Sequence, residues 1–342
     1  MKLKLYRFCK IFGKFMYVKN NNYKFSISGF FLLLLFASYT MASINHEKNI
    51  KSPDVVIHLP WGSGGLYAGG VDPNESAGQG PMSFTINSYG EIFLLDQLNY
   101  RVLSFDGDGK FIHETPISNG IFEDIEVLDN GYILLLDRTN RSEVVVFDSY
   151  GRELNHWKLI GDGIEEGGLV TAMLWRSDGL WLEYDHEHSV HIVDSNLMPC
   201  RREIVKGRIS LDTKKSIVAS LYGSNSASIA VIDRNSKKTI IEEKVFFDHN
   251  LYRIIWLDWD VHGNVYWFFH LVDRDVETDF PIFEEDRAFI FKTDLTKIGG
   301  FSSPFVIVPR EQFREFRVSP DGDIFQMAFT DEGVKILKWR WK

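Results

Sequence analysis

One short stretch concentrates the residues whose types could bind a metal. Within DHEHSVH, residues 185–191, His186 and His188 carry imidazole nitrogens that Zn²⁺ binds readily. Side chains two positions apart point the same way only where the chain is extended, and no Cys or third His stands at a recognised zinc spacing. The stretch is therefore either a zinc site or an ordinary solvated hairpin loop, and the loop is the favoured interpretation.

A second stretch, FDGDG (105–109), has the oxygen-bearing residues of a calcium-loop start, but also the composition of a tight turn. FDSYG (147–151) stands in the same place of a later segment. Asp108 is not repeated, and no Glu follows at the distance of the last ligand in a calcium loop. The pattern favours repeated hairpin turns whose structural residues are Asp106, Gly109, Asp148 and Gly151.

A third pattern joins an Asp to a following Asn and Arg, as in Asp96, Asn99 and Arg101. Its first two members recur as Asp137 and Asn140. Short polar side chains satisfy backbone groups in hairpin loops, and an Arg can bridge to a carboxylate of a neighbouring strand. We predict a structural role for this motif.

These patterns recur because the chain is built from repeats. SYGEIFLLD (88–96), DNGYILLLD (129–137) and SDGLWLEYD (177–185) each place an Asp six residues after a Gly. Weaker copies are anchored at residues 215, 263 and 322, so that the intervals run from 36 to 59 residues. The runs are rich in Val, Ile, Phe and Tyr and lack helical periodicity. The prediction is an all-β fold, a six-bladed β-propeller with four-stranded antiparallel blades.

Closure of the ring gives a second argument for this fold. The last unit has three strand candidates, and DVVIHLP (54–60) is a spare strand before the first unit. If this N-terminal strand closes the last blade, no sheet edge is left open there. We expect one domain over residues 53–342, with blades near 81–118, 121–160, 169–206, 207–247, 251–298 and 303–342 plus the closing strand 54–60.

The first two units resemble the NHL-type repeat of six-bladed propellers. The resemblance rests on GPMSFTINSYGEIFLLDQLNYRVLSFDGDGKFI (80–112) and FEDIEVLDNGYILLLDRTNRSEVVVFDSYGREL (122–154), whereas the other four units match only in pattern. Such propellers include lyases, lactonases, hydrolases and plain binding modules, so the resemblance implies a fold and leaves the function open.

The resemblance also suggests which metals to consider. NHL-like amidating lyases hold zinc with channel-lining histidines, and the expected inner strands here contain none. Lactonase-type propellers hold calcium with carboxylates. The corresponding candidates are Glu123, Asp124 and Asp258, with Glu126 beside them. The alternative, which we favour, is that these carboxylates are salt partners of Arg208, Arg253 and Arg317.

An insertion in the fifth unit, HLVDRDVETDFPIFEEDR (270–287), is the longest expected loop. It holds seven acidic residues and two Arg around an apolar centre. An acidic loop with an apolar tip could contact a partner, although an ordinary solvated insertion would have the same composition. The candidate partner-binding residues are Asp275, Phe280, Phe283 and Glu284.

The N-terminus predicts export. Residues 1–42 hold six Lys and one Arg with no acidic residue, and their apolar run 27–42 is short for a membrane span and suits a signal segment. We expect a cleaved signal peptide or, alternatively, an uncleaved anchor, followed by a linker over 43–52. Residues 43–342 carry 31 basic and 47 acidic residues, a balance that argues against a nucleic-acid partner.

The function we expect is a non-enzymatic binding or scaffold module. No nucleophile motif is present, and a propeller site assembles from distant blades on the face where the loops between second and third strands gather. The alternative is a metal-dependent, lactonase-like hydrolase or lyase at the channel mouth. We predict no cofactor for the first function and Ca²⁺ or Zn²⁺ for the second. The expected partner is a protein or small molecule bound to a monomeric propeller, with membrane contact only through the N-terminal segment.

Overall fold

The computed structural model describes residues 52–72, 77–304 and 310–340. The chain divides between Glu47 and Lys48, and every described residue belongs to the second unit, Lys48–Lys342. The predicted signal segment and residues 43–51 of the predicted linker lie outside the described residues. No helix in the described part of the chain is long and apolar enough to cross a membrane. All that follows concerns the second unit.

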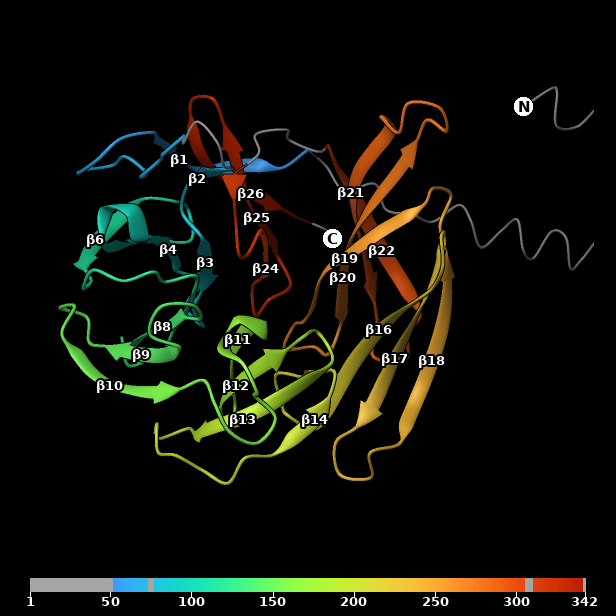
Figure 1. The fold of residues 1–342 in the computed structure, drawn as a ribbon, viewed down its shortest axis with the longest axis horizontal. Coiled ribbons are helices and arrows are strands. Elements are labelled where there is room, and N and C mark those ends of the chain that lie inside the picture. Colours follow the sequence, from blue (N-terminus) through green and yellow to red (C-terminus); the bar gives the residue numbers. More distant parts are fainter. Residues whose placement is uncertain (1–51, 73–76, 305–309, 341–342) are drawn as a thin grey trace, which may run out of the picture. The chain divides into compact units, whose positions relative to one another are not determined.

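Six sheets of four antiparallel strands stand around a common centre (Figure 1), which confirms the predicted six-bladed β-propeller. The strands of the first three blades are β3 (Ser83–Ile86), β4 (Ile92–Asp96), β5 (Arg101–Phe105) and β6 (Phe111–Pro116), then β7 (Asp124–Val127), β8 (Ile133–Asp137), β9 (Glu143–Phe147) and β10 (Glu153–Lys158), then β11 (Val170–Arg176), β12 (Gly179–Tyr184), β13 (His188–Asp194) and β14 (Ile204–Lys206).

The last three blades follow the same order from the centre outward. Their strands are β15 (Arg208–Ile209), β16 (Lys215–Gly223), β17 (Ser226–Asp233) and β18 (Thr239–Phe246), then β19 (Leu251–Trp259), β20 (Val265–Arg274), β21 (Pro281–Phe291) and β22 (Lys297–Pro304), then β24 (Phe316–Val318), β25 (Ile324–Thr330), β26 (Gly333–Trp339) and β1 (Asp54–Pro60). Short elements complete the described chain: η1 (Gln97–Asn99), η2 (Gly167–Leu169), and the parallel pair β2 (Gly78–Gln79) and β23 (Arg310–Glu311).

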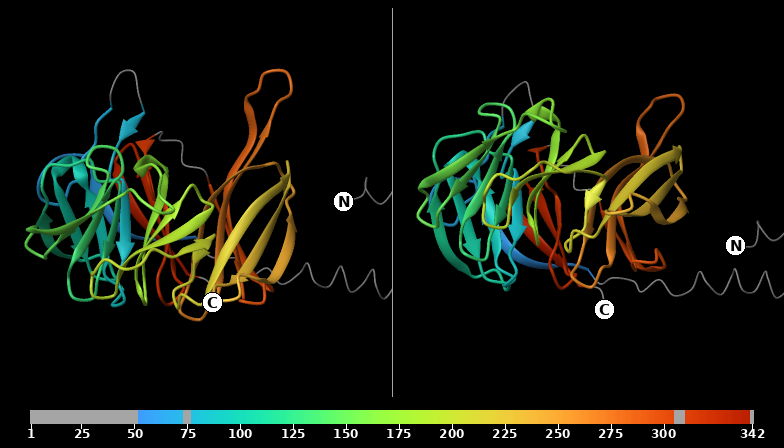
Figure 2. Two further views of the ribbon diagram at one scale, coloured as in Figure 1. Left: turned by 60° about the horizontal axis from the view of Figure 1, so that its bottom comes forward. Right: turned by 90° about the horizontal axis from the view of Figure 1, so that it is seen from below.

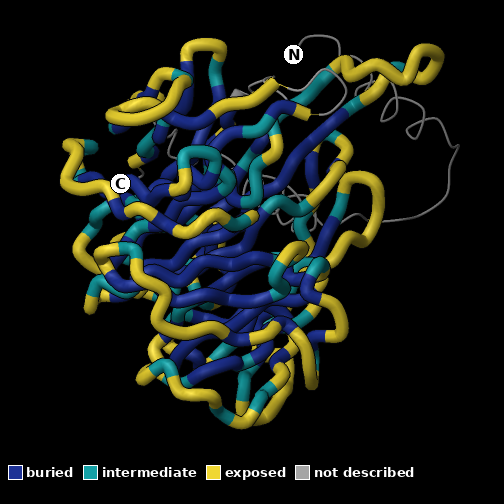
Figure 3. The backbone as a smooth tube through the Cα atoms, turned by 60° about the vertical axis from the view of Figure 1, so that its left-hand side comes forward, coloured by how far each residue is buried: buried dark blue, intermediate teal, exposed yellow. Residues whose placement is uncertain are grey.

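The middle strands are largely apolar because both of their faces are covered. Every residue of β8 (ILLLD) and of β9 (EVVVF) is buried. A strand that packs against a neighbouring sheet on each face reads as a continuous apolar run. Apolar clusters join each blade to its neighbours, and Figure 3 shows the buried strands inside and the exposed turns at the surface.

The FDGDG stretch forms a hairpin turn between β5 and β6. Asp106 Oδ1 accepts hydrogen bonds from the backbone N–H groups of Asp108 (3.1 Å) and Lys110 (2.8 Å). Gly109 has a φ of 82°, and a Cβ atom there would lie 1.7 Å from the carbonyl oxygen of Val56. The turn therefore requires glycine both for its conformation and for its contact with the closing strand.

The same turn recurs in the second blade. Asp148 Oδ1 accepts from the N–H groups of Tyr150 and Arg152, each at 2.9 Å. Gly151 has a φ of 79°, and its Cβ would lie 1.8 Å from the carbonyl oxygen of Pro116 in the preceding blade. Each of these turns thus fixes the spacing between a blade and the outer strand before it.

The sixth blade is closed by the N-terminal strand, as predicted. β1 pairs antiparallel with β26, and its residues Ile57 and Leu59 are 4% and 2% exposed. The edge of β26 is therefore paired within the same chain.

The motif of Asp96, Asn99 and Arg101 attaches the glycine-rich segment after β1 to the first blade. Asp96 accepts from the N–H of Gly69 and from Arg101 Nε, both at 2.9 Å. Arg101 Nη2 donates to the carbonyl oxygen of Tyr67 (2.6 Å), and Asn99 Nδ2 donates to Asp96 (2.8 Å). The motif therefore holds together two segments that are not neighbours in a sheet.

In the second blade the equivalent residues bind only their own loop. Asp137 Oδ1 accepts from the N–H groups of Asn140 (2.8 Å) and Arg141 (3.0 Å). A glycine-containing segment also contacts this loop, but through Arg138, which donates to the carbonyl oxygen of Gly168 (3.1 Å), and not through Asp137 or Asn140.

The insertion at residues 270–287 is a β-hairpin and not the long loop that we expected. β20 and β21 run far beyond the other strands of their blade and leave only residues 275–280 as a loop, so that the hairpin projects from the propeller (Figure 2). Pairs such as His270 with Asp286 and Asp273 with Phe283 continue the ladder through charged positions. Backbone pairing between β20 and β21 thus outweighs the acidic composition, which favoured a loop. The fifth blade also ends later than expected, because β22 extends to Pro304.

Candidate functional site

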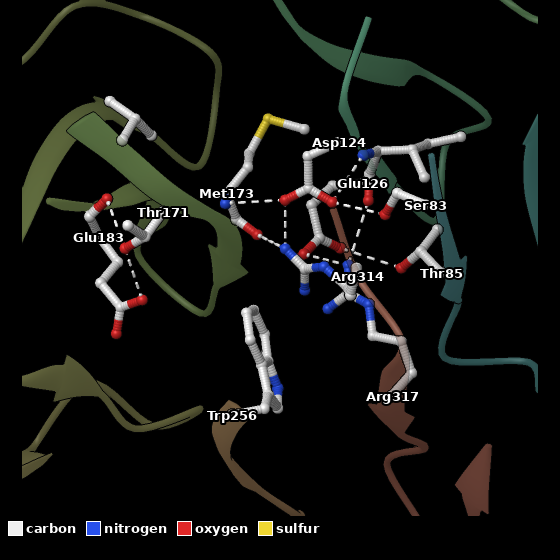
Figure 4. A network of polar contacts seen from close by, with 12 residues as sticks. Ser83, Thr85, Asp124, Glu126, Thr171, Met173, Glu183, Trp256, Arg314 and Arg317 are labelled. Carbon is white, nitrogen blue, oxygen red and sulfur yellow. Dashed lines mark hydrogen bonds and ion pairs between the residues drawn. The ribbon is translucent and has the colours of Figure 1, made fainter. Parts of the chain in front are cut away.

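A buried cluster of charged side chains lies where the inner strands meet. It contains four carboxylates and four guanidinium groups, on residues that are at most 7% exposed. Its members are Asp124, Glu126, Glu183, Asp258, Arg176, Arg208, Arg314 and Arg317. Equal numbers of opposite charges make the cluster neutral, as burial of ionised groups requires. We call it the charge cluster; Figure 4 shows much of it.

Asp124, at the start of β7, is the most connected carboxylate of the charge cluster. Its Oδ1 accepts from Ser83 Oγ (2.7 Å), and its Oδ2 accepts from the N–H of Met173 (3.0 Å) and from Arg314 Nη2. Arg314 also donates to the carbonyl oxygen of Met173 (3.0 Å). Burial, together with the neighbouring Arg317, lowers the pKa of Arg314 to about 10. Asp124 thus connects the second blade to the first, the third and the sixth.

Glu126 makes the next ion pair along β7. Its Oε1 accepts from Arg317 Nη2 (2.7 Å), and its Oε2 accepts from Thr85 Oγ1 (3.2 Å). Arg317 also donates to the carbonyl oxygens of Phe84 (3.2 Å) and Ile125 (3.1 Å). The guanidinium therefore connects the sixth blade to the first and second.

Glu183 and Arg208 form a two-point ion pair between the third and fourth blades. Arg208 Nε and Nη2 lie 2.9 and 2.5 Å from the two carboxylate oxygens. Burial acts to raise the pKa of Glu183, but the Arg208 guanidinium and the contact with His186 together outweigh it and hold that pKa well below its usual range. The guanidinium carbons of Arg208 and Arg314 lie 3.5 and 4.2 Å from the ring centroid of Trp256. Cation–π contacts thus link the ion pairs.

The carboxylates that we considered for calcium do not converge on one point. Asp124 pairs with Arg314, and Asp258 lies 3.6 Å from Arg176 Nη2. Glu123 pairs with Arg138 at 2.9 Å. Within residues 52–72, 77–304 and 310–340, no three His, Cys, Asp or Glu side chains are grouped to hold a metal. Of the arginines that we expected as salt partners, Arg317 pairs with Glu126, as expected, and Arg208 pairs instead with Glu183. Arg253 has no ion pair among the described residues.

His186 and His188 also have separate surroundings. Asp185 and His186 both have positive φ, 50° and 56°, and the N–H of Glu187 donates to Tyr184 O at 3.0 Å, so the loop is a tight turn. His186 Nδ1 lies 3.4 Å from Glu183, whereas His188 Nε2 contacts the carbonyl oxygen of Gly163 at 2.9 Å. The extended loop that a shared zinc ion would need is absent here.

A pocket of about 620 Å³ opens at the loop face of the propeller. Its polar wall consists of Arg138, Thr171, His186, Arg253, Asp286, Arg310, Gln312, Glu315 and Gln326, and its apolar wall includes Ile254, Ile255, Phe313, Met327 and Phe329. We call it the mouth pocket. Its volume is that of a small-molecule site. A second pocket of about 390 Å³ lies at the other ends of the inner strands, with the charge cluster between the two.

Glu315 is the most perturbed acid in the mouth pocket. Its Oε1 accepts from Gln326 Nε2 (2.8 Å), and the Gln326 amide is itself oriented because Ser303 Oγ donates to Gln326 Oε1 (3.1 Å). Burial, and then the charge of Asp286, raise the pKa of Glu315 to about 7. Perturbed acids in pockets are candidate functional groups.

Asp286 lines the same wall and is paired with the buried His270. His270 Nδ1 lies 2.6 Å from Asp286 Oδ1, and Nε2 lies 3.0 Å from Glu284 Oε1. Both His270 and Asp286 are 4% exposed. Neither His270 nor Glu315 is among the site residues that the sequence predicts. The available signal is an ionisable residue among apolar ones, and only the fold brings Glu315 and Asp286 to one pocket.

The four candidate partner-binding residues occupy two different places. Asp275 and Phe280 lie at the hairpin tip, where Phe280 is 72% exposed. Phe283 packs against the His249 ring, with centroids 3.5 Å apart. Glu284 contacts His270, which in turn contacts the pocket-lining Asp286. The hairpin therefore has an exposed apolar tip and a polar base.

No protein-family model matches the chain, and no curated protein matches it. Solved structures resemble it at low identity. Hydrazine synthase of Kuenenia stuttgartiensis is 15% identical over 72% of this chain and 72% of that one, with a TM-score of 0.46. A member of the DUF4221 family from Bacteroides vulgatus is 12% identical over 84% and 95%, with a TM-score of 0.46. Virginiamycin B lyase from Staphylococcus aureus is 11% identical over 80% and 99%, with a TM-score of 0.41. These similarities carry no argument about function, and the NHL-type resemblance stays a prediction.

Proposed function

We propose that this chain is an exported, monomeric, NHL-like propeller that binds a small polar molecule in the mouth pocket without catalysing its reaction. The observation that carries the proposal is the mouth pocket itself, with a volume of about 620 Å³. The buried charge cluster lies between it and the pocket at the other ends of the inner strands. A concave site with an apolar wall and a few convergent polar groups suits a small ligand. Export is supported by the basic and apolar N-terminal sequence.

The metal-dependent alternative has no observation of its own to favour it. Its carboxylate candidates are engaged by arginines, and its histidines have separate neighbours. We therefore develop only the binding function.

The projecting hairpin is the surface that we propose for a protein partner of the same module. Its exposed apolar residues include Val276, Phe280 and Ile282, which are 100%, 72% and 69% exposed. The base of the hairpin supplies Asp286 to the mouth pocket. A partner at the tip would thus contact the same hairpin that borders the ligand.

The test is a thermal-shift screen of the purified protein against small metabolites, followed by calorimetry on the compounds that raise the Tm. Ile254→Trp fills the mouth pocket and should abolish their binding. Phe280→Ser, at the hairpin tip, is the control and should leave it unchanged. The proposal is wrong if every compound that binds does so equally well to the Ile254→Trp protein, or if none binds at all.

A further inference from the structure

The mouth pocket contains charged groups whose bonding capacity is not used within the described protein. Arg253 forms no hydrogen bond or ion pair with the described residues, although Arg138 and Arg310 in the same wall are paired with Glu123 and Asp72. Arg253 is exposed at the pocket. It is therefore the guanidinium of this wall that is available to an anionic group of a ligand.

Two carboxylates of the same pocket each have only one oxygen engaged in a polar contact with the described residues. Glu315 uses one oxygen to accept from Gln326, and Asp286 uses one oxygen in its contact with His270. The second oxygen of each makes no hydrogen bond to the described residues. Asp286 is only 4% exposed, and it lines the mouth pocket, so its small accessible surface faces that pocket. Such groups gain most from a ligand that can donate hydrogen bonds.

The electrostatics of these carboxylates favour a cation. The Asp286 charge raises the pKa of Glu315, while Arg253 and His270 act in the opposite direction. Two neighbouring carboxylates repel each other, and a protonated amine beside them would relieve that repulsion. Asp286 on β21, His270 on β20 and Arg253 on β19 are thus the charged groups that act on Glu315. Three further cationic or titratable residues line the pocket: His186, Arg138 and Arg310.

We propose that the mouth pocket recognises a zwitterion with an apolar body, such as an apolar amino acid or a short apolar peptide. Its ammonium group binds Glu315 and Asp286, and its carboxylate binds Arg253. The apolar body lies against Phe313, Met327 and Phe329. This inference rests on the proposed function and specifies its ligand class. Arginine binds carboxylates in a two-point geometry, and ammonium groups donate up to three hydrogen bonds.

The test removes one charged group of the ligand at a time, and separately the residue proposed to bind that group. Calorimetry measures the binding of leucyl-phenylalanine, its N-acetyl form, its C-terminal amide and the free amino acids. Each compound is titrated into the unaltered protein and into the Glu315→Gln and Arg253→Gln variants. Acetylation and Glu315→Gln should each weaken binding about ten- to a hundredfold, since each removes a charged hydrogen bond. Together they should weaken it no further, because they delete the same contact. Amidation and Arg253→Gln should behave likewise.

Two controls and a pH series complete the experiment. Glu311→Gln and Arg274→Gln alter charges outside the pocket and should leave every affinity unchanged. Between pH 6 and 7 the affinity for the free dipeptide should rise as Glu315 ionises, and this rise should be lost in Glu315→Gln. A rise that persists in this variant would contradict the role of Glu315 as the group that binds the ammonium.

Some outcomes would overturn this inference alone. If metabolites bind in the mouth pocket but no free zwitterion does, or if blocked and free dipeptides bind equally, the ligand class is wrong and the binding function stands. If Ile254→Trp affects no ligand and none binds the pocket, both proposals fail.

Discussion

The same residue types have two different roles in this protein, and their neighbours decide which. In the charge cluster every carboxylate lies beside an arginine, as Asp124 lies beside Arg314. In the mouth pocket Glu315 and Asp286 lack such a partner. A buried ion pair connects neighbouring blades, whereas a carboxylate in a pocket with one oxygen that accepts no hydrogen bond favours the binding of a ligand. The roles of single residues therefore follow from pairing and not from residue type.

The first prediction concerns Asp124. Asp124→Asn leaves the Arg314 charge buried without its partner, and we expect it to reduce the free energy of unfolding by about 3–5 kcal/mol in urea titrations. The control Asp212→Asn removes an exposed pair with Lys214, 3.8 Å away, and should cost less than about 1 kcal/mol.

A double variant distinguishes the loss of the ion pair from the cost of leaving one charge buried without a partner. Asp124→Leu combined with Arg314→Met should recover part of the loss, because neither charge is then left alone. Equal effects of Asp124→Asn and Asp212→Asn would show that the buried pair does not matter for stability.

At the scale of elements, repeated turns fix how each blade sits against the one before it. Gly109 approaches the carbonyl of Val56, and Gly151 approaches that of Pro116. The hairpin of β20 and β21 departs from the repeat by continuing beyond its blade, which brings Asp286 to the mouth pocket. The repeated turns thus determine the spacing of the blades in the ring, and the extended hairpin of β20 and β21 borders the mouth pocket.

The second prediction compares two turn glycines of similar conformation. Gly90 has a φ of 80° and open space around its Cβ position, so Gly90→Ala should cost only about 1–2 kcal/mol of left-handed strain. Gly109→Ala adds a clash with Val56 O, 1.7 Å from the Cβ position, and should be clearly more destabilising in the same urea titration. Identical losses would mean that the contact with the closing strand relaxes freely.

At the scale of the whole molecule, the ring is closed by segments from the two ends of the propeller. β1 completes the sixth blade, and Asp96, Asn99 and Arg101 hold the segment that follows it. Closure leaves the edge of β26 paired and makes the first and last blades interdependent. We expect the propeller to unfold as one cooperative unit.

The third prediction tests that closure. Leu59→Ala removes a residue that is 2% exposed in β1 and should lower the free energy of unfolding by about 2–5 kcal/mol. Val55→Ala in the same strand, where Val55 is 55% exposed, should change little. Tryptophan fluorescence and far-UV circular dichroism should report the same shifted transition. Two separate transitions for Leu59→Ala would contradict cooperative closure.

The amino-acid sequence by itself determined the propeller, its blade count and its closing strand. Those features depend on local patterns, such as the Gly and Asp of SYGEIFLLD and the spare strand at 54–60, which repeat or stand out without knowledge of contacts. The amino-acid sequence did not determine which charged residues pair with each other. Asp124 and Arg314 are 190 residues apart, and Asp286, Arg253 and Glu315 come from β21, from β19 and from the segment just before β24. Only the tertiary structure decided which carboxylates are neutralised in the charge cluster and which border the mouth pocket, because electrostatic pairing depends on distance in space, and a ring of blades makes distant positions neighbours.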